Sequence, residues 1–252
     1  MRRSSLLLIA FLALSLWSSS IRAAEVLVAV AANFGAPMRK IAQAFESQSG
    51  HTATLALGAT GAFAAQIRNG APFDVLLAAD EETPARLEKE GLALAGSRFT
   101  YAIGRLALWS ARENYVGASG EVLARGDFAH IAIANPMLSP YGQAAVETMQ
   151  RMGVYGRLAP RIVQGENISQ AFQFVATDSV PLGFVALSQV QVDGKVAKGS
   201  AWVVPAQLHA PLRQDAVLLA RARGNAAAAA LVDFLKGEKA RGIIRAYGYE
   251  LQ

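Results

Sequence analysis

The chain contains no cysteine and only three histidines among its 252 residues. The absence of cysteine excludes disulfide scaffolds, thiolate zinc sites, iron–sulfur clusters and cysteine nucleophiles. None of the three histidines stands in a metal-ligand spacing such as H-E-x-x-H. The sequence also lacks the G-x-S-x-G, G-x-x-x-x-G-K-[ST] and G-x-G-x-x-G motifs. The case for an enzyme is therefore thin, and an exported hydrolase is kept only as an alternative.

Charged residues are scarce, at 17% of the chain, although the formal net charge is +5. Three arginines, Arg2, Arg3 and Arg22, lie in the first 23 residues, which contain no acid. Without these three arginines, the chain has 21 basic and 19 acidic residues, which gives a net charge of +2. No run of consecutive basic residues is longer than two. A nucleic-acid footprint requires clustered Lys and Arg. We therefore predict that the protein has no nucleic-acid partner.

The first 23 residues have the pattern of a secretory signal peptide. A positive start is followed by an uncharged apolar run at 6–17 and by small residues before Ala24. The run has 12 residues, whereas a membrane-spanning helix needs about 20. We predict that residues 1–23 are removed near Ala23 and that the protein is exported to the periplasm. Because a bacterial lipoprotein carries a cysteine at its cleavage point, we expect no lipid anchor.

In the mature chain, short apolar runs alternate with segments of helical periodicity. Strands are predicted at 26–31, 52–57, 75–79, 99–110 (as one or two strands), 131–134, 162–163, 181–186, 202–204 and 216–219. Helices are predicted from Pro37 to Gly50 and at 62–69, 81–90, 140–152, 168–177, 225–236 (capped by Asn225) and 238–247. Such alternation with short turns predicts an α/β fold whose mostly parallel sheets are covered by helices.

Four strand-to-helix turns, at 31–37, 57–62, 135–142 and 164–168, carry almost no charge. In α/β sheets, ligands bind at the carboxyl ends of strands, beside helix N-termini. Helix N-termini present unpaired N–H groups and the positive end of a dipole. If several of these turns converge, they can bind an anion without any lysine or arginine. The turns therefore predict an anion site.

Three side chains in these turns are candidate donors to the anion. Asn33 could donate through its side-chain NH₂, Thr60 through its hydroxyl and N–H, and Tyr141 through its phenol O–H. Such donors favour a fully ionised anion, because hydrogen phosphate would also need a carboxylate acceptor. Structural alternatives stay open: Asn33 as a helix N-cap, Tyr141 as an exposed turn aromatic, and glycines 58 and 61 as packing residues.

Five segments together resemble the molybdate-binding component of bacterial ABC importers. They are VLVAVAANFGAPMRKIAQAF (26–45), LALGATGAFAAQIRNGAPFDVLLAADEETPARL (55–87), IAIANPMLSPYGQAAVETMQRMG (131–153), GENISQAFQFVATDSVPLGFVALSQV (165–190) and FLKGEKARGIIRAYGYEL (234–251). The GAPFDVLLAAD block and the closing KG…YGYEL block are specific in combination. The resemblance covers nearly all of the mature chain.

The resemblance implies a two-lobed periplasmic binding protein of type II, with a ligand cleft between the lobes. Lobe one would comprise 24–104 plus 216–252 and lobe two 105–215, each with a sheet flanked by helices. The crossings would lie near 105–110 and 211–219. The implied ligand is molybdate or tungstate, with no cofactor, and the implied partner of the monomer is an inner-membrane ABC permease. The same fold with sulfate or phosphate as its ligand stays open.

The resemblance also carries ligand roles to particular residues. They fall on Asn33, Thr60, Tyr141 and the backbone N–H of Ile168, with Ala32 and Asn167 as secondary candidates. Molybdenum would be bound as molybdate through these residues, with no direct metal ligand. The better-known family pattern has serine at positions 33 and 60, alanine at 141 and a tyrosine in place of Ala186. Tyr141 would then replace that tyrosine from across the cleft.

Overall fold

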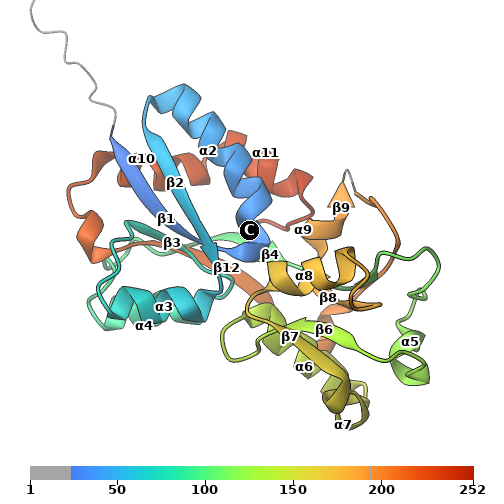
Figure 1. Cartoon of the computed structure of the whole chain (residues 1–252). Coiled ribbons are helices and arrows are strands. Elements are labelled where there is room, and N and C mark those ends of the chain that lie inside the picture. Colours follow the sequence, from blue (N-terminus) through green and yellow to red (C-terminus); the bar gives the residue numbers. More distant parts are fainter. Residues whose placement is uncertain (1–23, 193) are drawn as a thin grey trace, which may run out of the picture.

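The computed structural model describes residues 24–192 and 194–252, so the predicted signal peptide lies outside the described residues. Two five-stranded sheets with helices packed on them form the two parts of the molecule (Figure 1). The strands are β1 (Glu25–Ala31), β2 (Thr52–Gly58), β3 (Val75–Leu77), β4 (Phe99–Gly104), β5 (Leu106–Ser110), β6 (Ile131–Ala134), β7 (Ile162–Gly165), β8 (Gly183–Ala186), β9 (Gln191–Val192), β10 (Lys195–Val196), β11 (Ser200–Val203) and β12 (Leu212–Leu218).

The helices are distributed over both sheets. The α-helices are α2 (Gly35–Ser49), α3 (Thr60–Arg68), α4 (Glu82–Lys89), α5 (Glu121–Arg125), α6 (Pro140–Arg151), α7 (Tyr155–Leu158), α8 (Ile168–Ala176), α9 (Leu187–Val190), α10 (Ala226–Lys236) and α11 (Glu238–Ala246). The 3₁₀ turns are η1 (Ala32–Phe34), η2 (Ala159–Arg161), η3 (Ala206–Leu208) and η4 (Ala220–Ala222). Within the described residues, no helix has the length and apolar character that a membrane crossing requires.

The first sheet has the strand order β2-β1-β3-β12-β4. Strand β1 pairs in parallel with β2 and β3, and β12 pairs antiparallel with β3 and β4. Val26 and Val28 of β1 share a core cluster with residues of α2, α10 and α11. Because successive strand side chains point to opposite faces, Ala29 packs instead with residues of α3 and α4. Helices therefore cover both faces of this sheet.

The second sheet has the order β11-β5-β8-β6-β7, with β6 parallel to β7 and β8, and β5 antiparallel to β8 and β11. Leu106 and Leu108 of β5 pack with residues of α6 and α7, and Ala107 and Trp109 pack with residues of α8 and α9. The predicted α/β fold with two sheets flanked by helices is confirmed. The prediction that these sheets are mostly parallel is wrong, because each sheet contains two parallel and two antiparallel pairings.

The chain passes from the first sheet to the second at Arg105 and returns between β11 and β12. The region 99–110 is therefore two strands in different sheets. The start of the strand predicted at 216–219 is wrong, because β12 begins at Leu212. The first half of β12 contains the polar residues Gln214 and Asp215, which are buried in the structure, so its sequence did not predict a buried strand. The lobe division at 104/105 and 215/216 stays a prediction, and β12 begins before the second of these boundaries.

Several helix boundaries also differ from the predicted ones. Helix α3 begins at Thr60 rather than at 62, and the short helices α5, α7 and α9 were not predicted. The predicted cap of α10 is confirmed: Asn225 Oδ1 accepts the N–H groups of Ala227 at 3.0 Å and Ala228 at 3.3 Å. Short helices escape sequence patterns because one turn is too little to show a period.

Candidate anion site

Asn33 lies at the end of β1, where the chain turns into η1 and then α2. The first N–H groups of η1, from Ala32 and Asn33, have no partner within that turn. The side chain of Asn33 is buried, and its Nδ2 donates to Gln214 Oε1 at 2.9 Å and to Tyr249 Oη at 3.0 Å. Phe34, not Asn33, is the N-cap of α2. Both amide hydrogens of Asn33 are thus engaged inside the protein, and the expected donation of its NH₂ to the anion stays a prediction.

Thr60 is the first residue of α3 and is buried. Its Oγ1 accepts the N–H of Ala79 at 2.9 Å, which leaves the hydroxyl hydrogen for another acceptor. The next residue, Gly61, donates its N–H to the carbonyl of Leu138 at 2.8 Å, directly before α6. A Cβ at Gly61 would lie 3.0 Å from Leu138 Cα, so this glycine permits a close backbone approach. This contact brings the N-termini of α3 and α6 together.

Tyr141, in the first turn of α6, is 1% exposed. The alternative of an exposed turn aromatic is therefore wrong. Its hydroxyl oxygen accepts a hydrogen bond from Gln214 Nε2 at 3.1 Å. Burial raises the pKa of Tyr141 well above 10, so the phenol keeps its hydrogen at neutral pH. Tyr141 can therefore act as a proton-bearing donor in the interior.

The N-terminus of α8 presents one free amide. Asn167 is its N-cap, and Asn167 Oδ1 accepts the N–H groups of Ser169 at 2.9 Å and Gln170 at 3.1 Å. This cap leaves the N–H of Ile168, the first helical residue, without an intrahelical partner. Ser169 Oγ donates to the carbonyl of Ala32 at 3.2 Å, so α8 meets η1 across the two sheets. Asn167, a secondary candidate, uses its carbonyl oxygen as a cap.

The four predicted residues therefore converge, through contacts that span 181 positions of sequence in one case. Gln214 joins Asn33 to Tyr141, the Gly61–Leu138 contact joins the starts of α3 and α6, and Ser169 joins α8 to η1. A neighbouring pocket lies between η1 and α8, and of the four predicted residues only Asn33 lines it. It is lined by Ala32, Asn33, Ala36, Arg39, Ser169, Phe172, Gln173, Ser188 and Gln189.

Sequence reasoning missed four buried polar residues that hold these groups. Tyr249 Oη donates to the carbonyl of Asn33 at 2.8 Å, and Ser188 Oγ donates to the same carbonyl at 3.2 Å. Tyr101 Oη lies 2.9 Å from the carbonyl of Ala78 and 3.0 Å from Gln214 Oε1. Burial raises the pKa of Tyr249 to about 12 and that of Tyr101 well above 10. The YGYEL block contained Tyr249, but nothing local marked its contact.

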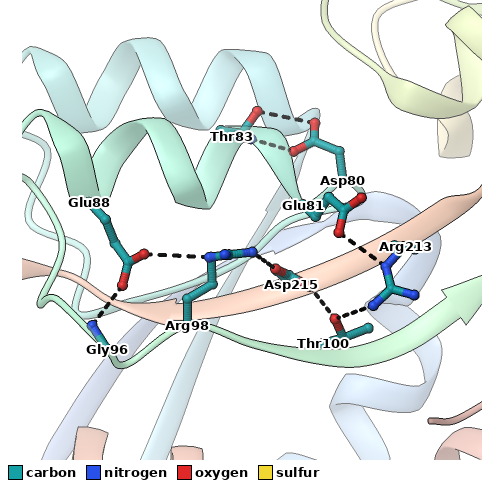
Figure 2. A network of polar contacts seen from close by, with 9 residues as sticks. All are labelled: Asp80, Glu81, Thr83, Glu88, Gly96, Arg98, Thr100, Arg213 and Asp215. Carbon is teal, nitrogen blue, oxygen red and sulfur yellow. Dashed lines mark hydrogen bonds and ion pairs between the residues drawn. The ribbon is translucent and has the colours of Figure 1, made fainter.

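The four candidate ligand residues are uncharged, and the carboxylate next to Gln214 is paired with an arginine. Asn33, Thr60, Tyr141 and Ile168 carry no formal charge. Asp215, next to Gln214, is tied to Arg98 Nη1 at 2.6 Å and to Thr100 Oγ1 at 2.7 Å (Figure 2). Among the residues described, 24–192 and 194–252, no group of three His, Asp or Glu side chains is placed to hold a metal ion. The arrangement is thus suited to an anion held by neutral donors.

Comparison with known proteins identifies the class to which this fold and site belong. Residues 26–250 match the model of a family described as bacterial extracellular solute-binding protein, and the chain belongs to that family. The chain is a solute-binding protein rather than an enzyme, as the sequence predicted.

Three relatives make the comparison more specific. The chain is 54% identical to the molybdate-binding protein ModA of Azotobacter vinelandii over 97% of each chain. It is 51% identical to ModA of Rhodobacter capsulatus, over 90% of this chain and 88% of the relative. The solved periplasmic molybdate-binding protein of Azotobacter vinelandii superposes with a TM-score of 0.87 at 41% identity, over 90% of this chain and 99% of the other. The resemblance predicted from the sequence is confirmed.

Proposed function

We propose that this protein captures molybdate, and tungstate as well, for an ABC importer. The sequence identity of 54% and 51% to two molybdate-binding proteins, over 97% and 90% of this chain, supports the choice of ligand. The mechanism is supported by the contacts that join uncharged helix starts from both sheets to one another. A tetrahedral dianion offers only acceptors, and these helix starts offer donors.

The proposed ligands are the hydroxyl and N–H of Thr60, the phenol O–H of Tyr141 and the N–H of Ile168. At η1 the donors are the N–H groups of Ala32 and Asn33, since the Asn33 side chain is engaged elsewhere. Molybdenum stays inside its oxyanion and has no direct protein ligand. Each neutral donor to a charged oxygen contributes about 1.5–3 kcal/mol, so several of them offset the cost of dehydrating the ion.

Selectivity follows from donor type and size. Hydrogen phosphate brings a proton that needs an acceptor, and the proposed ligands contain no carboxylate. Sulfate has the same charge and shape as molybdate but shorter bonds, so its rejection depends on the size of the closed site. This reasoning gives no preference between molybdate and tungstate.

The proposal extends to transport. The lobes would be 24–104 plus 216–252 and 105–215, and their closure on the anion would present a surface to an inner-membrane permease. The two passages of the chain between the sheets support a hinge there. Residues 1–23 would direct export and then be removed, leaving an unlipidated periplasmic monomer.

Titration calorimetry on refolded, ligand-free protein tests the proposal with molybdate, tungstate, sulfate and phosphate. We expect tight binding of one molybdate or tungstate per chain and much weaker heats with the other two anions. An equal response to all four anions, or no response to any, contradicts the proposal. Tight binding of sulfate alone would establish the alternative ligand in the same fold.

A further inference from the structure

Gln214 occupies an unusual place in β12, the strand that returns to the first sheet. It is 0% exposed, although its side chain is a polar amide. The pairing of β12 with β4 shifts beside it: Gln214 pairs with Ala102 and Asp215 with Thr100, so Tyr101 is the extra residue of a bulge. Bulges re-aim side chains and are frequent beside functional sites. Here Gln214 and the bulged Tyr101 meet at the candidate site.

The amide of Gln214 contacts both halves of the site. Its Oε1 accepts from Asn33 Nδ2 at 2.9 Å and lies 3.0 Å from Tyr101 Oη, and its Nε2 donates to Tyr141 Oη at 3.1 Å. Gly104, at the end of β4, makes room for this contact, because a Cβ there would collide with both Tyr141 Oη and Gln214 Nε2. The contact between Gln214 Nε2 and Tyr141 Oη is therefore tightly packed against the backbone of Gly104.

These contacts have a direction that matters for an anion. An amide nitrogen only donates and an amide oxygen only accepts, whereas a phenol has one hydrogen to give. Because Gln214 Nε2 fills a lone pair of Tyr141 Oη, the hydrogen of Tyr141 has to point to another acceptor. The neighbouring side-chain acceptor is Tyr249 Oη, which already accepts from Asn33 Nδ2. Because Gln214 Oε1 draws Asn33 Nδ2, the Asn33 side chain is held in one orientation at η1. The Gln214 side chain thus fixes the direction of the Tyr141 O–H and the orientation of the Asn33 amide.

We infer that Gln214 is a positioning residue whose amide turns the Tyr141 O–H toward the bound oxyanion and holds Asn33 in place. The inference rests on the proposed function. It predicts that an acceptor in place of Nε2 would compete with the oxyanion for the Tyr141 hydrogen. Gln214→Glu makes that change with nearly the same shape.

An ionised glutamate at position 214 would accept the Tyr141 hydrogen and repel the dianion, so tight binding would require a protonated carboxyl. The phenols at this position belong to Tyr101 and Tyr141, with Tyr249 next to Tyr141, and burial raises the pKa of all three above 10. Two carboxylates lie nearby. Asp215 is paired with Arg98. Asp80, whose pKa is raised by burial, accepts hydrogen bonds from Thr83. Among these groups, the introduced carboxyl is therefore the one whose protonation we expect to be linked to binding of the anion.

The experiment is titration calorimetry with molybdate from pH 6 to 8, in buffers of different ionisation enthalpy. For Gln214→Glu we expect uptake of about one proton per anion and up to a tenfold loss of affinity for each unit of rising pH. Wild-type protein should take up none and show little pH dependence. The matched control is Gln66→Glu on the exposed side of α3, which makes the same change in charge and should bind like the wild type.

A second variant covers the case in which the buried glutamate prevents folding. Gln214→Met keeps the volume and removes both polar atoms, so we expect weaker binding at every pH with no proton uptake. Wild-type affinity in both Gln214 variants, without proton uptake in the glutamate variant, overturns the inference while leaving the proposed function intact. Wild-type protein that binds no oxyanion overturns both.

Discussion

Tyr141→Phe removes one oxygen from the candidate site and leaves the aromatic ring in place. The hydroxyl has two predicted roles: it donates to the anion, and it accepts a hydrogen bond from Gln214 Nε2 at 3.1 Å. The first role affects affinity, whereas the second affects the folded protein in both its free and bound states. The two effects can therefore be measured separately on one variant.

The magnitudes follow from these roles. A neutral donor to a charged acceptor contributes about 1.5–3 kcal/mol, so its loss weakens binding by about 10- to 150-fold at about 1.4 kcal/mol per tenfold. The amide hydrogen of Gln214, left buried without its acceptor, costs about 1–3 kcal/mol of folding stability. In a chain of this size each kcal/mol lowers the melting temperature by about 2–4 °C.

Calorimetry with molybdate and thermal unfolding of the ligand-free protein measure the two effects. Tyr155→Phe is the control, because Tyr155 is a partly buried tyrosine packed on the same core. It should change neither quantity much. Unchanged molybdate affinity in Tyr141→Phe would refute the donor role of the phenol, even if the melting temperature fell as expected.

Three further predictions follow from the same contacts. Thr60→Val removes the hydroxyl that accepts from Ala79 and is proposed to donate to the anion; calorimetry should show at least about tenfold weaker molybdate binding, and unchanged affinity would leave Thr60 only its N–H. Gly61→Ala places a Cβ 3.0 Å from Leu138 Cα; because this contact joins the starts of α3 and α6, the clash should weaken molybdate binding measured by calorimetry, and wild-type affinity would show that the close approach is not needed for binding. The free energy of unfolding should also fall as pH rises from about 10, the pKa of a tyrosine in the unfolded chain, toward about 12, the pKa of buried Tyr249. The reason is that a raised pKa in the folded state stabilises the protein only while the phenol is protonated. Denaturant midpoints that do not change over this pH range would contradict the prediction.

Much of the fold was predictable because apolar patterns report burial directly. The run of valine and alanine in β1 and the helical periodicity of α2 and α8 each matched the structure closely. Strand β12 was the informative failure. Its first half contains Gln214 and Asp215, which are buried because partners distant in sequence satisfy them, and a local pattern contains no such information.

The site was predictable in part for the same reason. Turns with almost no charge before helices pointed to Thr60 and Tyr141, the family resemblance pointed to Ile168, and contacts in the structure join those helix starts. The role expected of the Asn33 side chain stays a prediction, and the structure adds that its amide is engaged by Gln214 and by a tyrosine 216 positions away. Donor availability depends on such tertiary contacts, which sequence spacing does not reveal.

The most direct measurement of the central claim is the position of molybdenum itself. Crystals grown with molybdate, measured on both sides of the molybdenum absorption edge, should give one strong anomalous peak per chain. The account predicts that peak between Thr60, Tyr141 and the N–H of Ile168, with no lysine, arginine or carboxylate in contact with the oxyanion. A peak against a guanidinium, such as that of Arg39 in the neighbouring pocket, would contradict it.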